Sequence, residues 1–425
     1  MYILGRPLFW SSLAKCIGIL SQYGIITLLS QGLSSFAFGV WAVLMQLAMF
    51  VSLCDLGIGG GALRNALIEL QKVSCDQEAE KKLFYLSFWV VGMIACAVLF
   101  LGLWCHPWMT KLLFGELPQD IPLSKLMPLF LCSLLLRLPL SLHASGFYAY
   151  HEITVKSYME IIEALLLFLG VYVVYISSCN FSLVIIVYYT LLVLMAAFGL
   201  YLFLHRRCWR VCWGSWGACK SLFKKHLTFW LQNVVSLALF SLMPLCVSAL
   251  GGAALAGEYF LVYRICTLCL GIHFAILNPL WSAYCHRFYA QKYEEIRWWH
   301  QRAFVCTLVG FSVASLCMIV WYQPVIFFWT RKIVSCKGVV VALGIWMTLY
   351  GVINCFSVLL NAVTAVKRQL VFLSVGACIQ LFLGALLGPA YGVVGIVVAA
   401  IIALVPLLFS NIIEVQSVLR RGRVS

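Results

Sequence analysis

The sequence predicts an all-α integral membrane protein with about twelve transmembrane helices in two groups of six. Its 425 residues are 64% hydrophobic and only 10% charged, with a mean hydropathy of +1.01, whereas about 25% of the residues in a soluble domain are charged. The apolar runs are long enough for helices that span a bilayer, and they do not alternate as barrel strands do. Backbone groups in lipid must pair internally, so these runs are predicted to be helices.

Twelve apolar segments account for most of the chain. They cover residues 10–31, 36–59, 83–105, 122–143, 158–177, 181–204, 227–250, 254–279, 303–323, 338–362, 371–388 and 393–415. A basic stretch separates the first six from the last six. We therefore predict an N-terminal six-helix bundle over 1–205, a basic cytoplasmic linker over 206–226 and a C-terminal six-helix bundle over 227–425.

The charges of the loops predict the orientation. By count, 21 of the 29 Lys and Arg residues fall in loops on the side of the N-terminus, and four fall on the opposite side. Basic loops are retained in the cytoplasm, so both termini are expected there. The same bias explains the formal charge of +15 without nucleic acid as a partner. No cleavage site follows Met1–Trp10, so the first apolar run is expected to remain as a helix.

One stretch closes the second apolar run with an acid, several glycines and an arginine. Asp55 follows a long uncharged run, and an ionisable group at that depth usually faces a protein interior or a water-filled cavity and has a partner. Gly57 and Gly61 would let another helix approach closely. We expect Asp55 to border a central polar cavity between helices. The structural alternative is a helix-end cap or a partner of Arg64.

Four ionisable residues lie inside apolar surroundings: Lys15, Asp55, Arg137 and Arg264. Lys15 lies near the start of its run, where its side chain can also reach the membrane surface. The two arginines lie deeper, where a charge is seldom tolerated without a role. Three cations and one acid would give the cavity a net positive charge. Such a cavity attracts an anion, and arginine makes forked contacts with phosphate oxygens.

Other polar residues have simpler interpretations. Glu160 and Glu163 are expected at a solvated cytoplasmic helix end, where the helix dipole favours acids. A weak internal similarity at an offset of 218 residues aligns Lys15 with Asn233 and Asp55 with His273. Asn233 and His273, together with Arg64 after the second apolar run, are candidate supporting residues of the cavity. As a lone histidine on an apolar helix, His273 is also compatible with a core residue that makes one hydrogen bond.

Several kinds of chemistry are not expected. The chain has no P-loop pattern and no GxSxG or HExxH motif, so neither an ATPase nor a hydrolase is predicted. Cys266 and Cys269 have CxxC spacing but lie within an apolar run and have no second pair, so neither a metal nor another cofactor is expected. The loops on the external side are short, the longest covering about His106–Ile121, which leaves little room for a membrane glycan polymerase.

Several segments together resemble a known family. The segment Asp55-Leu-Gly-Ile-Gly with Arg64 resembles the D-L-G-hydrophobic-G segment of Wzx-type polysaccharide-export flippases, which belong to the multidrug/oligosaccharidyl-lipid/polysaccharide exporter superfamily. Further similar segments are Gly257–Arg264, Leu277–Tyr284, Pro324–Thr330, Leu360–Thr364 and Gly392–Gly395. The resemblance covers nearly the whole chain through loose motifs. Arg331 follows Trp329-Thr330 where the family often has glycine.

The resemblance implies two six-helix bundles around a central cavity and alternating access. The substrate would be a polyprenyl-diphosphate-linked oligosaccharide that crosses the bacterial inner membrane, with basic cavity residues on its phosphates or acidic sugars. Membrane lipids, a coupling ion and glycan-assembly proteins are the other expected partners. The alternatives are a cation-coupled multidrug antiporter of the same superfamily, a lipid II flippase, which usually has two extra spans, and a membrane glycan polymerase.

Overall fold

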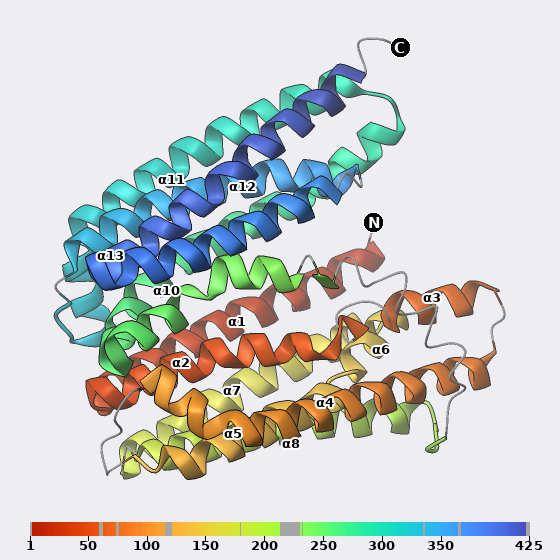
Figure 1. Ribbon diagram of the computed structural model, residues 1–425. Coiled ribbons are helices and arrows are strands. Elements are labelled where there is room, and N and C mark those ends of the chain that lie inside the picture. Colours follow the sequence, from red (N-terminus) through yellow and green to blue (C-terminus); the bar gives the residue numbers. More distant parts are fainter. Residues whose placement is uncertain are drawn as a thin grey trace. The chain divides into compact units, whose positions relative to one another are not determined.

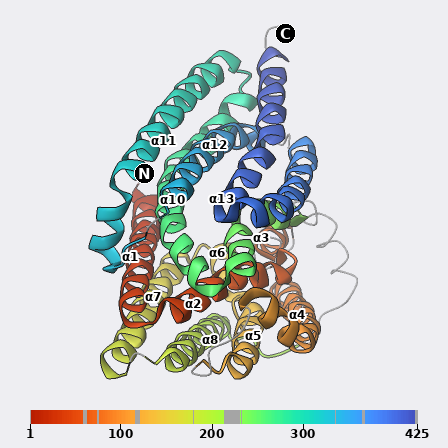
Figure 2. The same cartoon turned by 60° about the vertical axis from the view of Figure 1, so that its left-hand side comes forward.

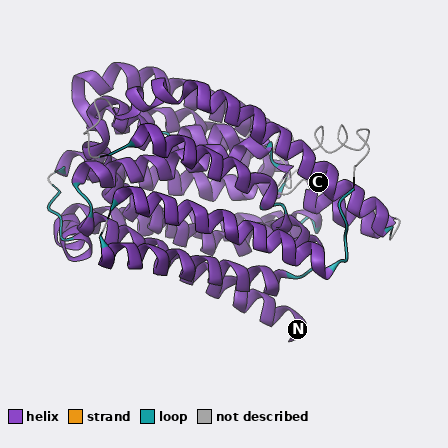
Figure 3. Cartoon of the chain, turned by 90° about the horizontal axis from the view of Figure 1, so that it is seen from below, coloured by secondary structure: helices purple, strands orange, loops and turns teal. Residues whose placement is uncertain are grey.

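The computed structural model is built of helices. It describes residues 2–58, 63–73, 76–114, 121–178, 180–212, 230–231, 233–334, 336–363 and 367–421. Over these ranges the regular structure is helical throughout, without a strand (Figure 3). Ten helical stretches are long and apolar enough to cross a membrane, so the chain is a multi-pass membrane protein.

The chain divides into two compact units, Met1–Asn233 and Val234–Ser425. The predicted linker, 206–226, lies largely outside the described residues, so its extent stays a prediction. Unit 1 contains α1 (Tyr2–Gly32), α2 (Ser35–Val51), the 3-10 turn η1 (Ser52–Asp55), α3 (Leu63–Val73), α4 (Gln77–Phe114), α5 (Leu123–Leu140), α6 (His143–Ala149), α7 (Ile153–Ser177) and α8 (Phe181–Arg206). Unit 2 contains α10 (Met243–Tyr289), α11 (Tyr293–Thr330), α12 (Lys337–Ala362) and α13 (Lys367–Arg421).

Two of the apolar stretches are too long to cross a membrane once. Asn233–Leu277 has 45 residues and Arg368–Arg420 has 53, so a straight helix of either length would extend for about 70 to 80 Å. Both contain a glycine whose backbone is not helical: Gly252 has φ 77° and ψ 178°, and Gly392 has φ 62° and ψ −145°.

The chain reverses direction at each of these glycines. The Tyr263 hydroxyl donates to the Phe240 carbonyl over 2.8 Å although the two residues are 23 positions apart, a separation of about 35 Å along a straight helix. A Cβ at Gly388 would lie 3.5 Å from the Ile396 side chain, on the other side of the second glycine. Each long stretch is therefore a pair of antiparallel spans. This raises the ten stretches to the twelve spans that the sequence predicts.

In unit 1 the longest interface joins α1 and α7, which lie side by side (Figure 1). The Ser21 hydroxyl donates to the Ala164 carbonyl across this interface. A Cβ at Gly24 would come within 2.6 Å of the Phe168 ring, so only a glycine admits that ring so closely. Around this pair, α7 packs on α8, α8 on α5, and α5 on α4.

In unit 2, α12 is the central helix and packs against α10, α11 and α13 (Figure 2). It carries large buried side chains, among them Trp346. The rings of Phe240 and Tyr350 stack with their centroids 3.7 Å apart, and the Ser315 hydroxyl donates to the Gly344 carbonyl over 2.9 Å. The buried face of α12 thus holds the other helices of this unit.

The reversal at Gly392 gives a stability prediction. Its backbone lies in a region that a residue with a Cβ adopts only at a cost of about 1–3 kcal/mol, although no atom would obstruct the Cβ itself. Gly392→Ala should therefore lower the melting temperature of the detergent-solubilised protein. Gly384→Ala, in the helical part of α13 and equally open, is the matched control. The control should melt at the wild-type temperature or slightly above it, and equal melting of both variants would contradict the strain.

Candidate functional site

Asp55 ends the second span. It is the last residue of η1, and its Oδ1 accepts a hydrogen bond of 2.8 Å from the backbone N–H of Gly57. The chain turns through left-handed conformations at Leu56 (φ 52°) and Gly57 (φ 76°). A short polar side chain is suited to such a turn because it satisfies a backbone donor that the helix no longer pairs. Asp55 therefore has the capping role that the sequence left as its structural alternative.

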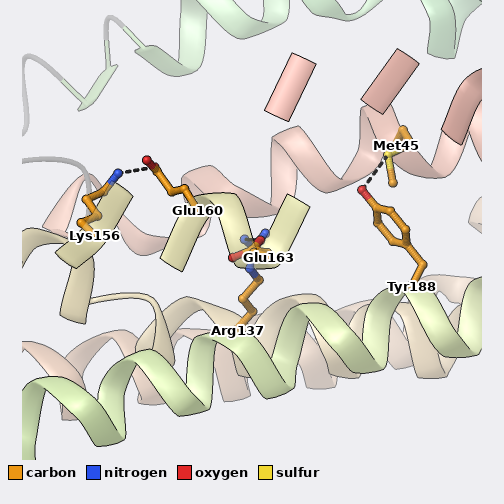
Figure 4. Close-up of polar contacts among 6 residues, drawn as sticks. All are labelled: Met45, Arg137, Lys156, Glu160, Glu163 and Tyr188. Carbon is orange, nitrogen blue, oxygen red and sulfur yellow. Dashed lines mark hydrogen bonds and ion pairs between the residues drawn. The ribbon is translucent and has the colours of Figure 1, made fainter. Parts of the chain in front are cut away.

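Arg137 and Glu163 form an ion pair inside unit 1. Nη2 of Arg137 on α5 lies 2.7 Å from Oε1 of Glu163 on α7 (Figure 4). Arg137 is the fifteenth of the 27 residues of the apolar stretch Leu123–Ala149, and Glu163 is the eleventh of the 25 residues of α7. The pair therefore lies near the middle of both spans, where an unpaired charge is most costly.

This position corrects the prediction for Glu163. The sequence placed it at a solvated helix end because the fifth apolar run was expected to begin at residue 158. The helix begins at Ile153 instead, and only 26% of the Glu163 side chain is exposed. The preceding turn of α7 carries a second pair, Lys156 with Glu160 (Figure 4). Two cations and two acids thus balance here, so the net positive charge expected for the cavity does not arise from Arg137.

The other predicted residues are not gathered around this pair. Lys15 on α1 is exposed and forms no ion pair within the described part of the chain. Arg64 on α3 donates from Nε to its neighbour Asn65 over 3.4 Å. Asn233 is exposed at the boundary of the two units.

Arg264 and His273 lie on α10 in unit 2. Arg264 is in the middle of its span, with its guanidinium carbon 5.0 Å from the centre of the Phe260 ring. The His273 Nε2 is 2.9 Å from the Thr307 hydroxyl, and its ring meets the Phe311 ring edge-on. His273 is thus a half-buried residue with one side-chain hydrogen bond. Asp55 caps a turn, so the aligned pair Asp55 and His273 have different structural roles.

A second polar cluster ties together the helix ends on the side of the predicted cytoplasmic loops. The Arg207 guanidinium stacks 3.7 Å from the centre of the Tyr150 ring, and its Nη2 donates to Glu152 over 3.2 Å. The Tyr150 hydroxyl donates to the buried Glu80 carboxylate on α4. Burial and the nearby Glu80 raise the pKa of Tyr150, so its hydroxyl remains a donor. The cluster joins α4 and α8 to the turn before α7.

Loss of Arg207 should destabilise unit 1. Its side chain is 10% exposed, whereas that of Arg206, which also pairs with Glu152, is 46% exposed. Without Arg207, Glu152 keeps only the exposed Arg206 as its partner, and loss of a mostly buried charged contact costs up to about 3 kcal/mol. Arg207→Met should therefore lower the melting temperature by several degrees, and Arg206→Met by about a degree or less. Equal effects of the two changes would contradict a structural role of the buried arginine.

The Arg137–Glu163 pair can be tested by a double-mutant cycle. Arg137→Gln leaves the Glu163 carboxylate without its partner among apolar helices. The added change Glu163→Gln removes this uncompensated charge. We expect a coupling free energy of about 2 kcal/mol from thermal unfolding of the purified protein, reduced by the partial exposure of both groups. The same cycle on Lys156 and Glu160, one turn apart on α7, should give about 0.5 kcal/mol or less. Additive effects at Arg137 and Glu163 would exclude a stabilising pair.

Comparisons with known proteins define the fold. No family model matches the sequence, and no curated protein matches it. Among solved structures, the chain is similar to an inward-facing multidrug resistance MATE family transporter of the MOP superfamily, with a TM-score of 0.78, 12% identity and coverage of 94% of this chain and 95% of that one. It is also similar to the lipid II flippase MurJ in an inward closed conformation, with a TM-score of 0.76, 14% identity and coverage of 96% and 87%.

A third similar structure is a MOP superfamily transporter from Pyrococcus furiosus, with a TM-score of 0.62, 13% identity and coverage of 97% and 96%. Its description reports a binding pocket of reversed polarity and infers a different function from it. The chain therefore has the fold of MOP superfamily transporters. At these identities the likeness concerns the fold and does not extend to substrates.

Proposed function

We propose that this protein is a transporter that works by alternating access. We further propose that it is a flippase that moves a polyprenyl-diphosphate-linked oligosaccharide across the bacterial inner membrane, with both termini in the cytoplasm. The fold shared with multidrug transporters and a lipid flippase supports transport. The position of Arg137 is the observation that carries the substrate class, because a mid-membrane arginine with accessible donors suits a phosphate group.

Arg264 supplies a similar group in unit 2. It lies in the middle of its span beside the Phe260 ring, and the resemblance to polysaccharide-export flippases includes its segment, Gly257–Arg264. Arg264 is therefore a second candidate phosphate-binding residue, argued from its own unit alone. The 21 basic residues on the N-terminal side support the orientation.

A cation-coupled multidrug antiporter is the second candidate. It needs carboxylates within the membrane, and Glu163 is such a group in addition to Asp55. Drug susceptibility of a deletion strain separates the two functions, since loss of an antiporter sensitises cells and loss of a glycan flippase removes surface polysaccharide. A lipid II flippase is less supported, because MurJ is matched over only 87% of its length. A glycan polymerase has no support beyond the membrane location, and we propose no enzymatic activity.

Arg264 provides the test of the proposed function. Arg264→Gln should reduce translocation of a fluorescent polyprenyl-diphosphate oligosaccharide in proteoliposomes by about tenfold or more, because an arginine–phosphate contact contributes about 1.5–3 kcal/mol. The melting temperature should stay within a few degrees of wild type. Arg302→Gln is the control, since Arg302 stacks 3.5 Å from the centre of the Trp298 ring near the start of α11. Wild-type translocation by the Arg264 variant would remove this residue from the site.

A further inference from the structure

Arg137 is held by Glu163 on one side only. Its Nη2 makes the 2.7 Å contact, and its Nε is buried without a hydrogen-bond partner among the described residues. The side chain is nevertheless 36% exposed. A closed arginine–carboxylate pair commonly uses two parallel N–H donors. The contact is therefore a single hydrogen bond, and the partly exposed guanidinium keeps donors that Glu163 does not use.

The charges around Glu163 balance before any ligand binds. On α7 itself, Glu160 and Lys156 are its charged neighbours, and Arg137 faces it from α5. His143 on α6 and Tyr189 on α8 lie close to Arg137. On α1, the exposed Lys15 forms no ion pair with Glu163 within the described residues. Two acids thus face two cations, with the histidine and the tyrosine as the other titratable groups.

A phosphate that binds near Arg137 adds negative charge to this balanced set of groups. If it binds Arg137 while Glu163 stays ionised, two anions share one cation in a region of low dielectric constant. Like charges a few ångströms apart there repel strongly, and a carboxyl group relieves the repulsion by binding a proton. Anion binding and protonation of Glu163 are then linked events.

We propose that Glu163 is the displaceable counter-ion of Arg137: an anionic phosphate takes the guanidinium from Glu163, and the released carboxylate binds one proton from the aqueous solution. The identity of the anion, a lipid diphosphate, rests on the proposed function, whereas the exchange rests on the geometry of the pair. Glu163 acts through Arg137 and is a positioning residue. The exchange returns Arg137 to Glu163 when the ligand leaves and the proton dissociates.

The test measures binding and proton uptake by the purified full-length protein in nanodiscs. The probe is a short-chain isoprenyl diphosphate glucoside, whose two phosphates each carry one charge throughout the range from about pH 5 to pH 8, so that any linkage belongs to the protein. Calorimetry in buffers of different ionisation enthalpy gives the protons taken up per bound probe. The variants are Glu163→Gln and, as the matched control, Glu160→Gln one turn away on α7.

For the wild type we expect the affinity to weaken by up to about tenfold per pH unit as the pH rises, with up to one proton taken up per probe. Glu163→Gln should bind at least as tightly as the wild type at low pH, with no pH dependence and no uptake. Glu160→Gln should keep the wild-type dependence. Proton uptake that persists in Glu163→Gln, a loss of its affinity by tenfold or more, or no binding by either protein would overturn the proposal.

Translocation of the same probe into vesicles separates this inference from the proposed function. Linked binding without translocation would reject the flippase and leave the exchange intact. Translocation by a wild-type protein that takes up no proton would reject the exchange and leave the flippase intact.

Discussion

An ionised side chain within an apolar slab requires an opposite charge or a polar neighbour, and the arrangement of unit 1 follows from this requirement. Arg137 on α5 and Glu163 on α7 meet near the middle of their spans. Neither helix can rotate or slide by a turn without separating the two groups. The pair therefore fixes the register of two helices between which α8 also packs. Close packing of α7 on α1, at Gly24 and Ser21, extends this register to the first helix.

The remaining polar groups satisfy the same requirement in other ways. Asp55 lies at the end of a helical segment, and its side chain accepts a backbone hydrogen bond. Arg207 lies between aromatic rings and a carboxylate at the ends of the spans, and His273 bonds a threonine on the neighbouring helix. The Arg137–Glu163 pair differs from these arrangements because two charged side chains meet near mid-span, where a charge is costly and is commonly tied to function.

The sequence predicted the spans well because span length and hydropathy are local properties. Even the two long apolar stretches followed the prediction, since Gly252 and Gly392 lie between predicted spans and adopt conformations that favour glycine. The pairing of Arg137 was missed for a reason that is also local. Lys156 was assigned to a loop, and Glu160 and Glu163 to a solvated helix end, although Lys156 and Glu160 pair with each other within α7. Five additional helical residues moved Glu163 by about 7 Å toward the middle of the span. The need of a deep arginine for a partner was the signal that could have identified it.

A balanced site suits a transporter better than the net positive cavity that the sequence suggested. A fixed excess of positive charge in a low-dielectric cavity would bind a diphosphate tightly and release it slowly, and transport requires both steps. With Glu163 beside Arg137, the protein supplies its own competitor for the guanidinium at a fixed and short distance. In the proposed exchange, binding replaces one ion pair by another, so the net free energy of binding is smaller than for an unpaired arginine. In the proposed flippase, affinity is reduced where release must follow, and the arginine is never left without an anion.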